Sequence, residues 1–153
     1  MSELWSKSAG ELARLIATSE VSSREVVEAH LARIAQVNPQ VNAITEVMSD
    51  SALAAADAAD AHQRSGQPRG AFHGVPFTVK TNIDVTGSAT HEGVEALKDL
   101  IAPSDAPVVE RMRAAGGIVL ARTNMPDFGL RINTESQLHG ATHNPWKKGH
   151  TAG

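Results

Sequence analysis

The sequence predicts an α/β fold in which helices flank a β-sheet. Three features indicate this class: capped helical patterns within residues 1–65, a short apolar strand at 75–79, and a helix followed by a second apolar strand at 118–121. Two strands joined by a helix are typical of a parallel pair, because a parallel connection needs a dozen or more residues. The composition, with 41% hydrophobic and 20% charged residues, is that of an ordered globular protein.

The segment 1–65 is predicted to be mainly helical. Ser8–Glu11 (SAGE) has the spacing of a capping box at the start of a short amphipathic helix, and Ser22–Glu25 (SSRE) repeats that spacing before a longer one. We expect the longer helix to end at Asn38-Pro39, because the residue before proline is pushed out of the α region. A short strand at 42–47 and an alanine-rich helix at 49–65 complete the segment.

The segment 70–130 is predicted to fold as strand, helix and strand, and 131–153 as a loop-rich tail with many turn formers. Its expected parts are a strand at Val75–Val79, a connection at 87–103 with one helical turn, a helix capped by Ser104-Asp105 and ended by Gly116-Gly117, a strand at 118–121, and a helical turn starting at Asn124-Met125-Pro126. We treat all 153 residues as a portion of one domain.

Composition argues against several classes of function. The net charge is −3 with no block of like charge, so we expect neither a nucleic-acid nor a membrane-surface partner. No apolar run approaches the roughly 20 residues that cross a bilayer, and the first ten residues do not resemble a secretory signal. Without cysteine there is no thiolate chemistry or cysteine-based zinc site. A cytoplasmic location is therefore predicted.

A lysine, Lys80, directly follows the first predicted strand. A free lysine has a pKa of about 10.4, and burial lowers it because desolvation disfavours the charged form. A neutral amine at a buried strand end could accept a proton from a serine hydroxyl and act as a general base. On the residues alone, a solvated lysine at the strand end is the commoner case, since buried lysines are rare.

Other chemistry is weakly represented. His139 and His143 have the spacing of two metal ligands on a helix, but Gly140 and Asn144-Pro145 oppose a helix there, so no metal and no cofactor is predicted. Candidate nucleophiles in loops are Ser88 and Ser136, while Ser8, Ser22, Ser23 and Ser104 are better explained as helix caps. There is no G-x-S-x-G motif.

Five blocks, taken together and in this order, resemble the amidase signature family of serine hydrolases. They are His73–Asp84, Asp105–Val109 with Arg113–Leu120, Ala121–Phe128, Thr134–Ser136, and Gly140–Trp146. The resemblance covers nearly all 153 residues but only the amino-terminal part of a typical member. It implies a mixed β-sheet flanked by helices, present here as an incomplete part of that fold.

For catalysis, the resemblance implies a Ser–Ser–Lys triad without a cofactor. Lys80 matches the base and favours an inward, shielded amine. The bridging serine with its cis peptide bond and the attacking serine are expected on loops after Gly153, so the 153-residue chain alone is expected to be inactive. Asn82, Asn124, Met125, Thr134 and Asn144 become candidates for bracing loops or lying near substrate. Thr81 departs from the family, which usually has aspartate there.

The resemblance implies hydrolysis of a linear amide to a carboxylate and ammonia or an amine, with a small-molecule amide as substrate. Two alternatives remain. One is the amidase subunit of the glutamyl-tRNA amidotransferase complex, although Met125–Phe128 and Thr134–Gln137 fit a stand-alone amidase better. The other is a catalytically inactive truncated fragment or interaction module. The two amino-terminal helices could also dock a second copy as a homodimer.

Overall fold

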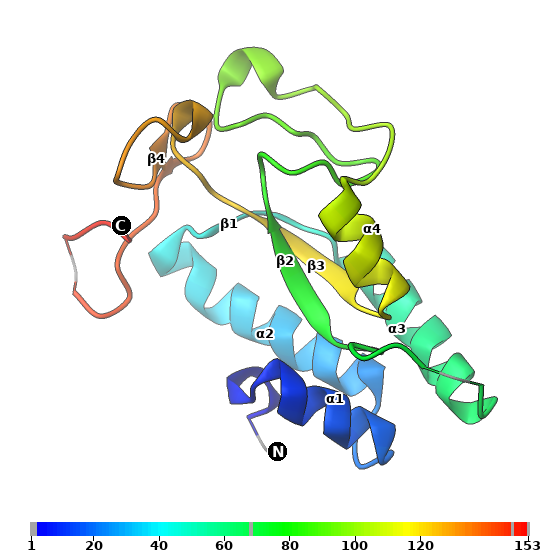
Figure 1. Cartoon of the computed structure of the whole chain (residues 1–153). Coiled ribbons are helices and arrows are strands. Elements are labelled where there is room, and N and C mark those ends of the chain that lie inside the picture. The colour runs from blue at the N-terminus through cyan, green and yellow to red at the C-terminus, as the bar shows by residue number, and fades with distance from the viewer. Residues whose placement is uncertain (1–2, 68, 148, 153) are drawn as a thin grey trace. The chain divides into compact units, whose positions relative to one another are not determined.

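The computed structural model describes residues 3–67, 69–147 and 149–152. Its main helices and strands run in the order α1 (Ala9–Ala17), α2 (Ser23–Val41), β1 (Ile44–Val47), α3 (Ser49–Arg64), β2 (Pro76–Lys80), α4 (Pro107–Ala114), β3 (Ile118–Thr123), β4 (Glu135–Ser136) and β5 (Gly140–Ala141) (Figure 1). Short 3-10 turns lie at Leu4–Ser6, Glu95–Leu97 and Asp127–Gly129. The predicted α/β class is confirmed.

The chain forms two compact units, each assembled from three separate stretches. The first unit comprises Met1–Ile34, Met48–Phe77 and Glu110–Leu120, and the second comprises Ala35–Val47, Thr78–Val109 and Ala121–Gly153. Four of the five divisions fall inside α2, β2, α4 and β3, so these elements contribute residues to both units.

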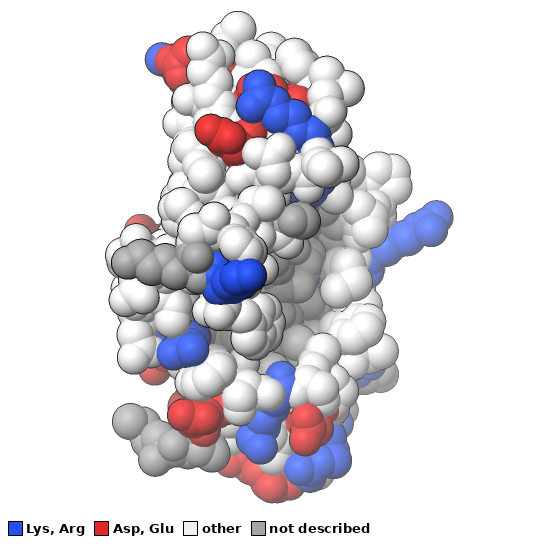
Figure 2. Space-filling model, turned by 90° about the vertical axis from the view of Figure 1, so that its left-hand side faces the viewer, with Lys and Arg blue, Asp and Glu red and all other residues white. Residues whose placement is uncertain are grey.

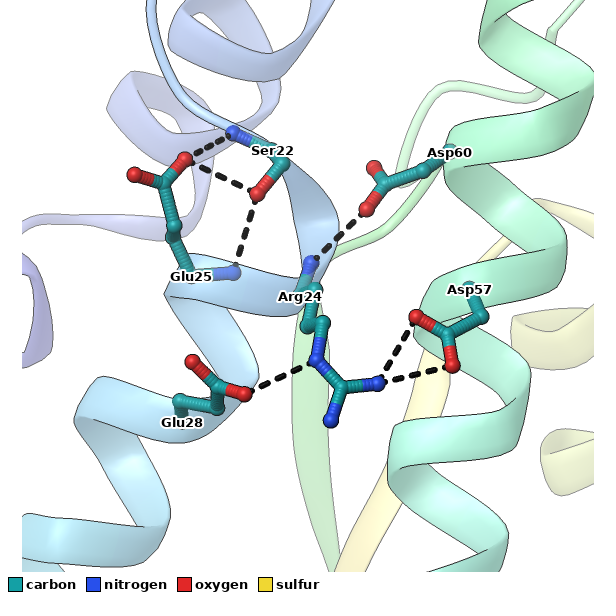
Figure 3. Close-up of polar contacts among 6 residues, drawn as sticks. All are labelled: Ser22, Arg24, Glu25, Glu28, Asp57 and Asp60. Carbon is teal, nitrogen blue, oxygen red and sulfur yellow. Dashed lines mark hydrogen bonds and ion pairs between the residues drawn. The ribbon is translucent and has the colours of Figure 1, made fainter.

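In the first unit, both predicted capping boxes are present. The backbone N–H of Ser8 donates to Glu11 Oε2 over 2.8 Å, and the backbone N–H of Glu11 donates back to Ser8 Oγ over 3.3 Å. Ser22 and Glu25 make the same reciprocal pair at 2.8 and 3.1 Å at the start of α2 (Figure 3). Each box satisfies two backbone donors that the first helical turn leaves unpaired, and one such cap contributes about 1 kcal/mol.

Two aspartates of α3 hold the start of α2 (Figure 3). The carboxylate of Asp60 accepts from the backbone N–H groups of Ser23, at 2.7 Å, and Arg24, at 3.2 Å. A negative charge at a helix N-terminus is favourable because it complements the helix dipole. One turn earlier on α3, both carboxylate oxygens of Asp57 accept from Arg24 Nη1. These contacts fix α2 against α3 with groups that the helix start would otherwise leave unpaired.

The apolar core of the first unit has two clusters that meet α2 on adjacent residues. Val26 packs with residues of α1 and with Val75, whereas Val27 packs with alanines of α3 and with residues of β3. Both valines are fully buried. Successive helical residues point about 100° apart, so α2 is covered over a wide arc. The buried members are Leu4, Leu12, Leu15, Ile16, Val26 and Val75 in one cluster, and Val27, Ala52, Ala56, Ile118 and Leu120 in the other.

The predicted end of α2 at Asn38-Pro39 is wrong, because the helix continues to Val41 with Pro39 inside it. The backbone N–H of Asn42 still donates to the carbonyl of Asn38 over 2.7 Å, and Asn42 then adopts a left-handed φ of 53°. Such a residue is a common helix terminator. Asn38 Oδ1 accepts from the next two backbone N–H groups, those of Ala43 and Ile44. A proline in the last turn is thus tolerated, and Asn42 ends the helix instead.

The three-stranded sheet has the order β1-β3-β2. In the first unit the N–H of Ile118 donates to the carbonyl of Val75, and in the second unit the N–H of Thr81 donates to the carbonyl of Thr123. Both strands advance in the same direction between these bonds, which confirms the predicted parallel pair of β2 and β3. β1 pairs antiparallel with β3, with Glu46 opposite Arg122. The sheet is therefore mixed.

The helix between these strands, α4, ends at the predicted glycine pair. The N–H of Gly117 donates to the carbonyl of Met112 over 2.9 Å, and that of Gly116 to the carbonyl of Arg113 over 2.8 Å. With a φ of 90° at Gly116, this is the Schellman arrangement that closes a helix. The helix begins at Pro107, two residues after Asp105, whose Oδ1 accepts from the N–H of Thr86.

The tail in the second unit is more ordered than expected. Two-residue strands β4 and β5 pair antiparallel within it, where only loop was predicted. On the face drawn in Figure 2, basic and acidic side chains lie scattered among uncharged ones. None of the helices in the described part of the chain is long and apolar enough to cross a membrane.

Candidate functional site

The candidate site lies in the second unit, where the parallel strands end. Lys80 is the last residue of β2, and Asn124 directly follows β3. The bond from Thr81 N to Thr123 O, 3.2 Å long, joins the two strand ends. Functional groups of α/β proteins commonly gather at the carboxyl ends of parallel strands, where loops leave the sheet. The two residues therefore belong to one edge.

The side chain of Lys80 is exposed, so the expectation of a shielded amine is wrong for this chain. Strand alternation gives the reason. Val79 is buried, while Thr78 and Lys80 share the opposite face of β2 and are both exposed. The apolar residues that suggested burial, at positions 75, 77 and 79, point away from that face. Lys80 therefore leaves the strand on an open side.

The backbone after Lys80 forms a tight turn that an arginine holds. The N–H of Ile83 donates to the carbonyl of Lys80 over 3.0 Å, which closes the turn. Arg122 Nη2 donates to the carbonyl of Ile83 at 2.7 Å and, more weakly, to that of Lys80 at 3.4 Å. The Arg122 side chain is 0% exposed. A buried cation thus reaches the backbone at the base of the candidate lysine.

Arg122 is itself fixed through a serine and a glutamate. Its Nη1 donates to Ser88 Oγ over 2.8 Å, and Ser88 Oγ donates to Glu46 Oε2 over 2.6 Å. Burial lowers the pKa of Arg122 from its ordinary value, whereas the carboxylates of Glu46 and Asp84 raise it. The three side chains come from β1, a loop and β3 and form one chain of polar contacts in the second unit, in which Arg122 and Ser88 are buried and Glu46 is exposed.

Neither loop serine is placed as a nucleophile. Ser88 is buried and bonded to both Arg122 and Glu46. Ser136 is also buried; its hydroxyl donates to Asn124 Oδ1 over 3.2 Å and accepts from the backbone N–H of His139 over 3.0 Å. A catalytic serine needs a neighbouring base and space for the substrate carbonyl to approach. Both hydroxyls are instead buried and occupied by these hydrogen bonds, which gives them a structural role.

Asn124 links the end of β3 to the tail. Its Nδ2 donates to the carbonyl of Gly140 and to Thr142 Oγ1, both over 3.1 Å. Its Oδ1 accepts from Ser136 and from the backbone N–H of Met125. Thr142 Oγ1 in turn donates to the carbonyl of Asn42 over 2.6 Å. The side chain therefore holds several tail residues at the edge where Lys80 lies.

The remaining candidates differ in their surroundings. Asn82 is exposed and Met125 is 1% exposed. The backbone of Thr134 accepts from Thr142 N and donates to Thr151 Oγ1. Asn144 Oδ1 accepts from the backbone N–H groups of two nearby residues, Trp146 and Lys147, which is a local turn. None of these contacts involves Lys80.

Thr81, which stands where the resembling family usually has aspartate, is 0% exposed. Its backbone bonds to Thr123 and to Glu92. Its hydroxyl has no hydrogen-bond partner in the described part of the chain. Threonine thus fits the space at the strand end but leaves a buried polar atom unused, which costs stability.

Two histidines of the second unit form a close pair. His91 Nε2 and His139 Nε2 lie 3.1 Å apart, and His91 Nδ1 lies 3.0 Å from the backbone N–H of Gly93. Since Nδ1 accepts from that N–H, the hydrogen-bond network assigns the proton of neutral His91 to Nε2, which donates to His139. Among the described residues, no three histidine or carboxylate side chains could hold a metal ion.

The histidine pair predicts a loss of stability in mild acid. Burial lowers the pKa of His91, and the charges of His139 and Arg122 lower it further, while the carboxylate of Glu46 raises it. Burial also lowers the pKa of His139, and the carboxylate of Glu95 raises it. The unfolded chain therefore takes up protons first, so stability is greatest above about pH 6.5 and declines below it. Urea midpoints between pH 7.5 and 5.5 should show this slope, and His139→Gln should reduce it. An equal slope in that variant would contradict the assignment.

Sequence reasoning missed Arg122, Ser88 and Glu46 as a group. One signal was available: Arg122 is a charge inside an apolar strand pattern, where a guanidinium must find buried partners. Its partners could not be identified from the sequence, because they are distant along the chain. Ser88 lies 34 residues from Arg122, and Glu46 lies 42 residues from Ser88. The pairing of β1 with β3 places Glu46 opposite Arg122, and the loop that contains Ser88 supplies the third residue.

Comparison with known proteins places this geometry in a family. The amidase family model matches residues 25–153. The chain is 47% identical to indoleacetamide hydrolase of Bradyrhizobium diazoefficiens over 98% of this chain and 29% of that protein. It is 43% identical to a glutamyl-tRNA(Gln) amidotransferase subunit of Salinispora arenicola over 95% of this chain and 30% of that protein.

A solved structure agrees with these relatives. A bacterial aryl acylamidase of the amidase signature family superposes with a TM-score of 0.88 at 32% identity, covering 92% of this chain and 30% of that one. The chain thus spans about 30% of the length of the relatives it matches. A family model over most of the chain, with relatives above 40% identity, settles the family: this chain belongs to the amidase signature family.

Proposed function

We propose that this chain is the lysine-bearing amino-terminal part of an amidase that hydrolyses a small linear amide to a carboxylate and ammonia or an amine. Lys80 serves as the general base of a Ser–Ser–Lys triad. A bridging serine relays the proton and a second serine attacks the carbonyl. Both serines are supplied by sequence beyond Gly153.

The placement of Lys80 carries this proposal. The amine stands at the carboxyl end of a parallel strand, on a face of β2 that is open in this chain. The segment that brings the hydroxyl to that face also covers the amine, and this shielding favours the neutral form that a general base requires. The buried loop serines Ser88 and Ser136 are committed to other hydrogen bonds and do not compete for the role.

A stand-alone enzyme is the form we propose, and indole-3-acetamide is the first substrate to test because of the 47% identity to an indoleacetamide hydrolase. The 43% identity to an amidotransferase subunit supports a second candidate, in which the protein works with partner subunits on glutamyl-tRNA. Purification separates the two: a stand-alone amidase is active as one species, whereas the subunit requires its partners. The proposed enzyme acts in the cytoplasm.

The test compares the 153-residue chain with the longer product of the same reading frame. We expect the longer product to release ammonia from indole-3-acetamide and to be labelled on one serine by a fluorophosphonate. The 153-residue chain should do neither. Turnover by the 153-residue chain would contradict the proposal that both catalytic serines lie beyond Gly153. The proposed amidase activity would be contradicted if the longer product folds but is not labelled and does not hydrolyse indole-3-acetamide, acetamide or an aryl anilide.

A further inference from the structure

We propose that Arg122 is a positioning residue for Lys80: its buried guanidinium fixes the turn Lys80–Ile83 and so sets the direction in which the lysine leaves β2. The inference rests on the proposed function for its catalytic consequence. The structural part, that one arginine holds this turn, stands on contacts within the second unit.

Arg122 donates hydrogen bonds to the first and last residues of the turn. Its own bond runs from Ile83 N to Lys80 O over 3.0 Å. Arg122 Nη2 adds a bond of 2.7 Å to the carbonyl of Ile83 and a longer contact of 3.4 Å to that of Lys80. The first distance is that of a strong hydrogen bond, and the second is near the limit. A planar cation therefore ties the first and last residues of the turn.

The arginine can hold the turn because it is itself immobile. It is paired within the sheet, where Glu46 of β1 lies opposite it. Ser88 accepts from its other terminal nitrogen at 2.8 Å and passes a 2.6 Å bond on to Glu46. The side chain is completely buried, and its fork geometry leaves few alternative orientations once two nitrogens are bonded.

Stability alone does not account for this residue. In the part of the chain that the structure describes, Arg122 forms no direct ion pair, and its Nε has no hydrogen-bond partner. Burying a cation that contacts no carboxylate directly is costly, and the carboxylates of Glu46 and Asp84 offset that cost only from a distance. What the guanidinium provides, and an apolar side chain cannot, is simultaneous donation to two carbonyls of one turn and to Ser88.

This hold matters for a base. Catalysis needs the amine within hydrogen-bond reach of the hydroxyl that it deprotonates. Misplacing a reacting group by about 1 Å can lower the rate by roughly 100-fold. The turn that Arg122 holds sets the position of the Lys80 backbone, and therefore the direction in which its Cα–Cβ bond leaves β2. Removing the guanidinium should lower kcat and leave KM nearly unchanged.

The experiment uses the full-length product with the variants Arg122→Met and Arg122→Lys. Val26→Ala is the control, because it removes buried volume from the core of the first unit, whereas the turn belongs to the second unit. We expect kcat on indole-3-acetamide to fall about 10- to 100-fold in Arg122→Met with KM within about twofold. Arg122→Lys should have a kcat between those of the wild type and Arg122→Met, since an ammonium keeps the charge but lacks the planar, forked donors of the guanidinium. The control should keep the wild-type kcat.

Amide hydrogen exchange at Ile83 supplies a readout besides activity. Exchange should accelerate in both Arg122 variants and not in Val26→Ala. Unchanged exchange at Ile83, or a kcat equal to that of the control, would overturn the inference. If Arg122→Met does not fold, Arg122→Lys carries both measurements. If the wild type hydrolyses no amide, the proposed function fails, and exchange at Ile83 still decides whether Arg122 holds the turn.

Discussion

Replacing Lys80 with methionine in the full-length protein should abolish most amide hydrolysis without unfolding it. General-base catalysis typically contributes about 10²–10⁴-fold to the rate, so kcat/KM should fall at least that far. The side chain is exposed, and substitutions at exposed positions usually change stability by about 0.5 kcal/mol or less. Ammonia release and a urea denaturation curve measure the two quantities separately.

Lys98→Met is the matched control for that experiment. Lys98 is also exposed, lies in the same unit, and pairs with Glu95 over 2.7 Å. A surface ion pair of this kind contributes little, so both activity and stability should stay near wild type. A Lys80→Met variant that retained more than a tenth of the wild-type kcat/KM would show that another group is the base.

Gly116→Ala should be the most damaging single-methyl substitution among the helix-terminating glycines. The residue has a φ of 90°, and a Cβ there would lie 2.6 Å from the Cα of His73 and 3.0 Å from its N. The left-handed conformation costs an alanine about 1–2 kcal/mol. Relieving contact with backbone atoms, which cannot rotate away, adds about 1–3 kcal/mol. A decrease of roughly 2–5 kcal/mol in the free energy of unfolding is expected.

Gly66→Ala separates the two contributions. Gly66 follows α3 as Gly116 follows α4, with a φ of 70°, but a Cβ there would meet nothing within 4 Å. That variant should show only the conformational cost. Urea denaturation of the two variants measures the difference directly. Equal losses would mean that the close approach of Gly116 to His73 carries no energetic weight.

Local signals predicted most of the elements. The two capping boxes, the glycine pair after α4 and the apolar strands act over a few residues, so the sequence reveals them. The end of α2 was missed because the rule for Pro39 competes with a stronger terminator three residues later, Asn42. The short strands β4 and β5 carry too few residues for a periodic pattern.

The candidate site was predictable only in part. The resemblance pointed to Lys80, but its exposure follows from alternation along β2, in which Lys80 shares a face with Thr78. The hold of Arg122 on the turn could not be inferred, because it depends on contacts between residues about 40 positions apart. Asn124 was singled out, yet its partners at Gly140 and Thr142 became visible only with the pairing of the tail.

The interleaved construction of the two units has a consequence for biogenesis. During synthesis from the amino terminus, the first unit lacks its last stretch until residue 120 has been made, and the second lacks its last stretch until the tail emerges. The amino-terminal helices therefore lack part of their packing partners until strands encoded much later have been synthesised. For the same reason no single proteolytic cut can release either unit as one continuous peptide.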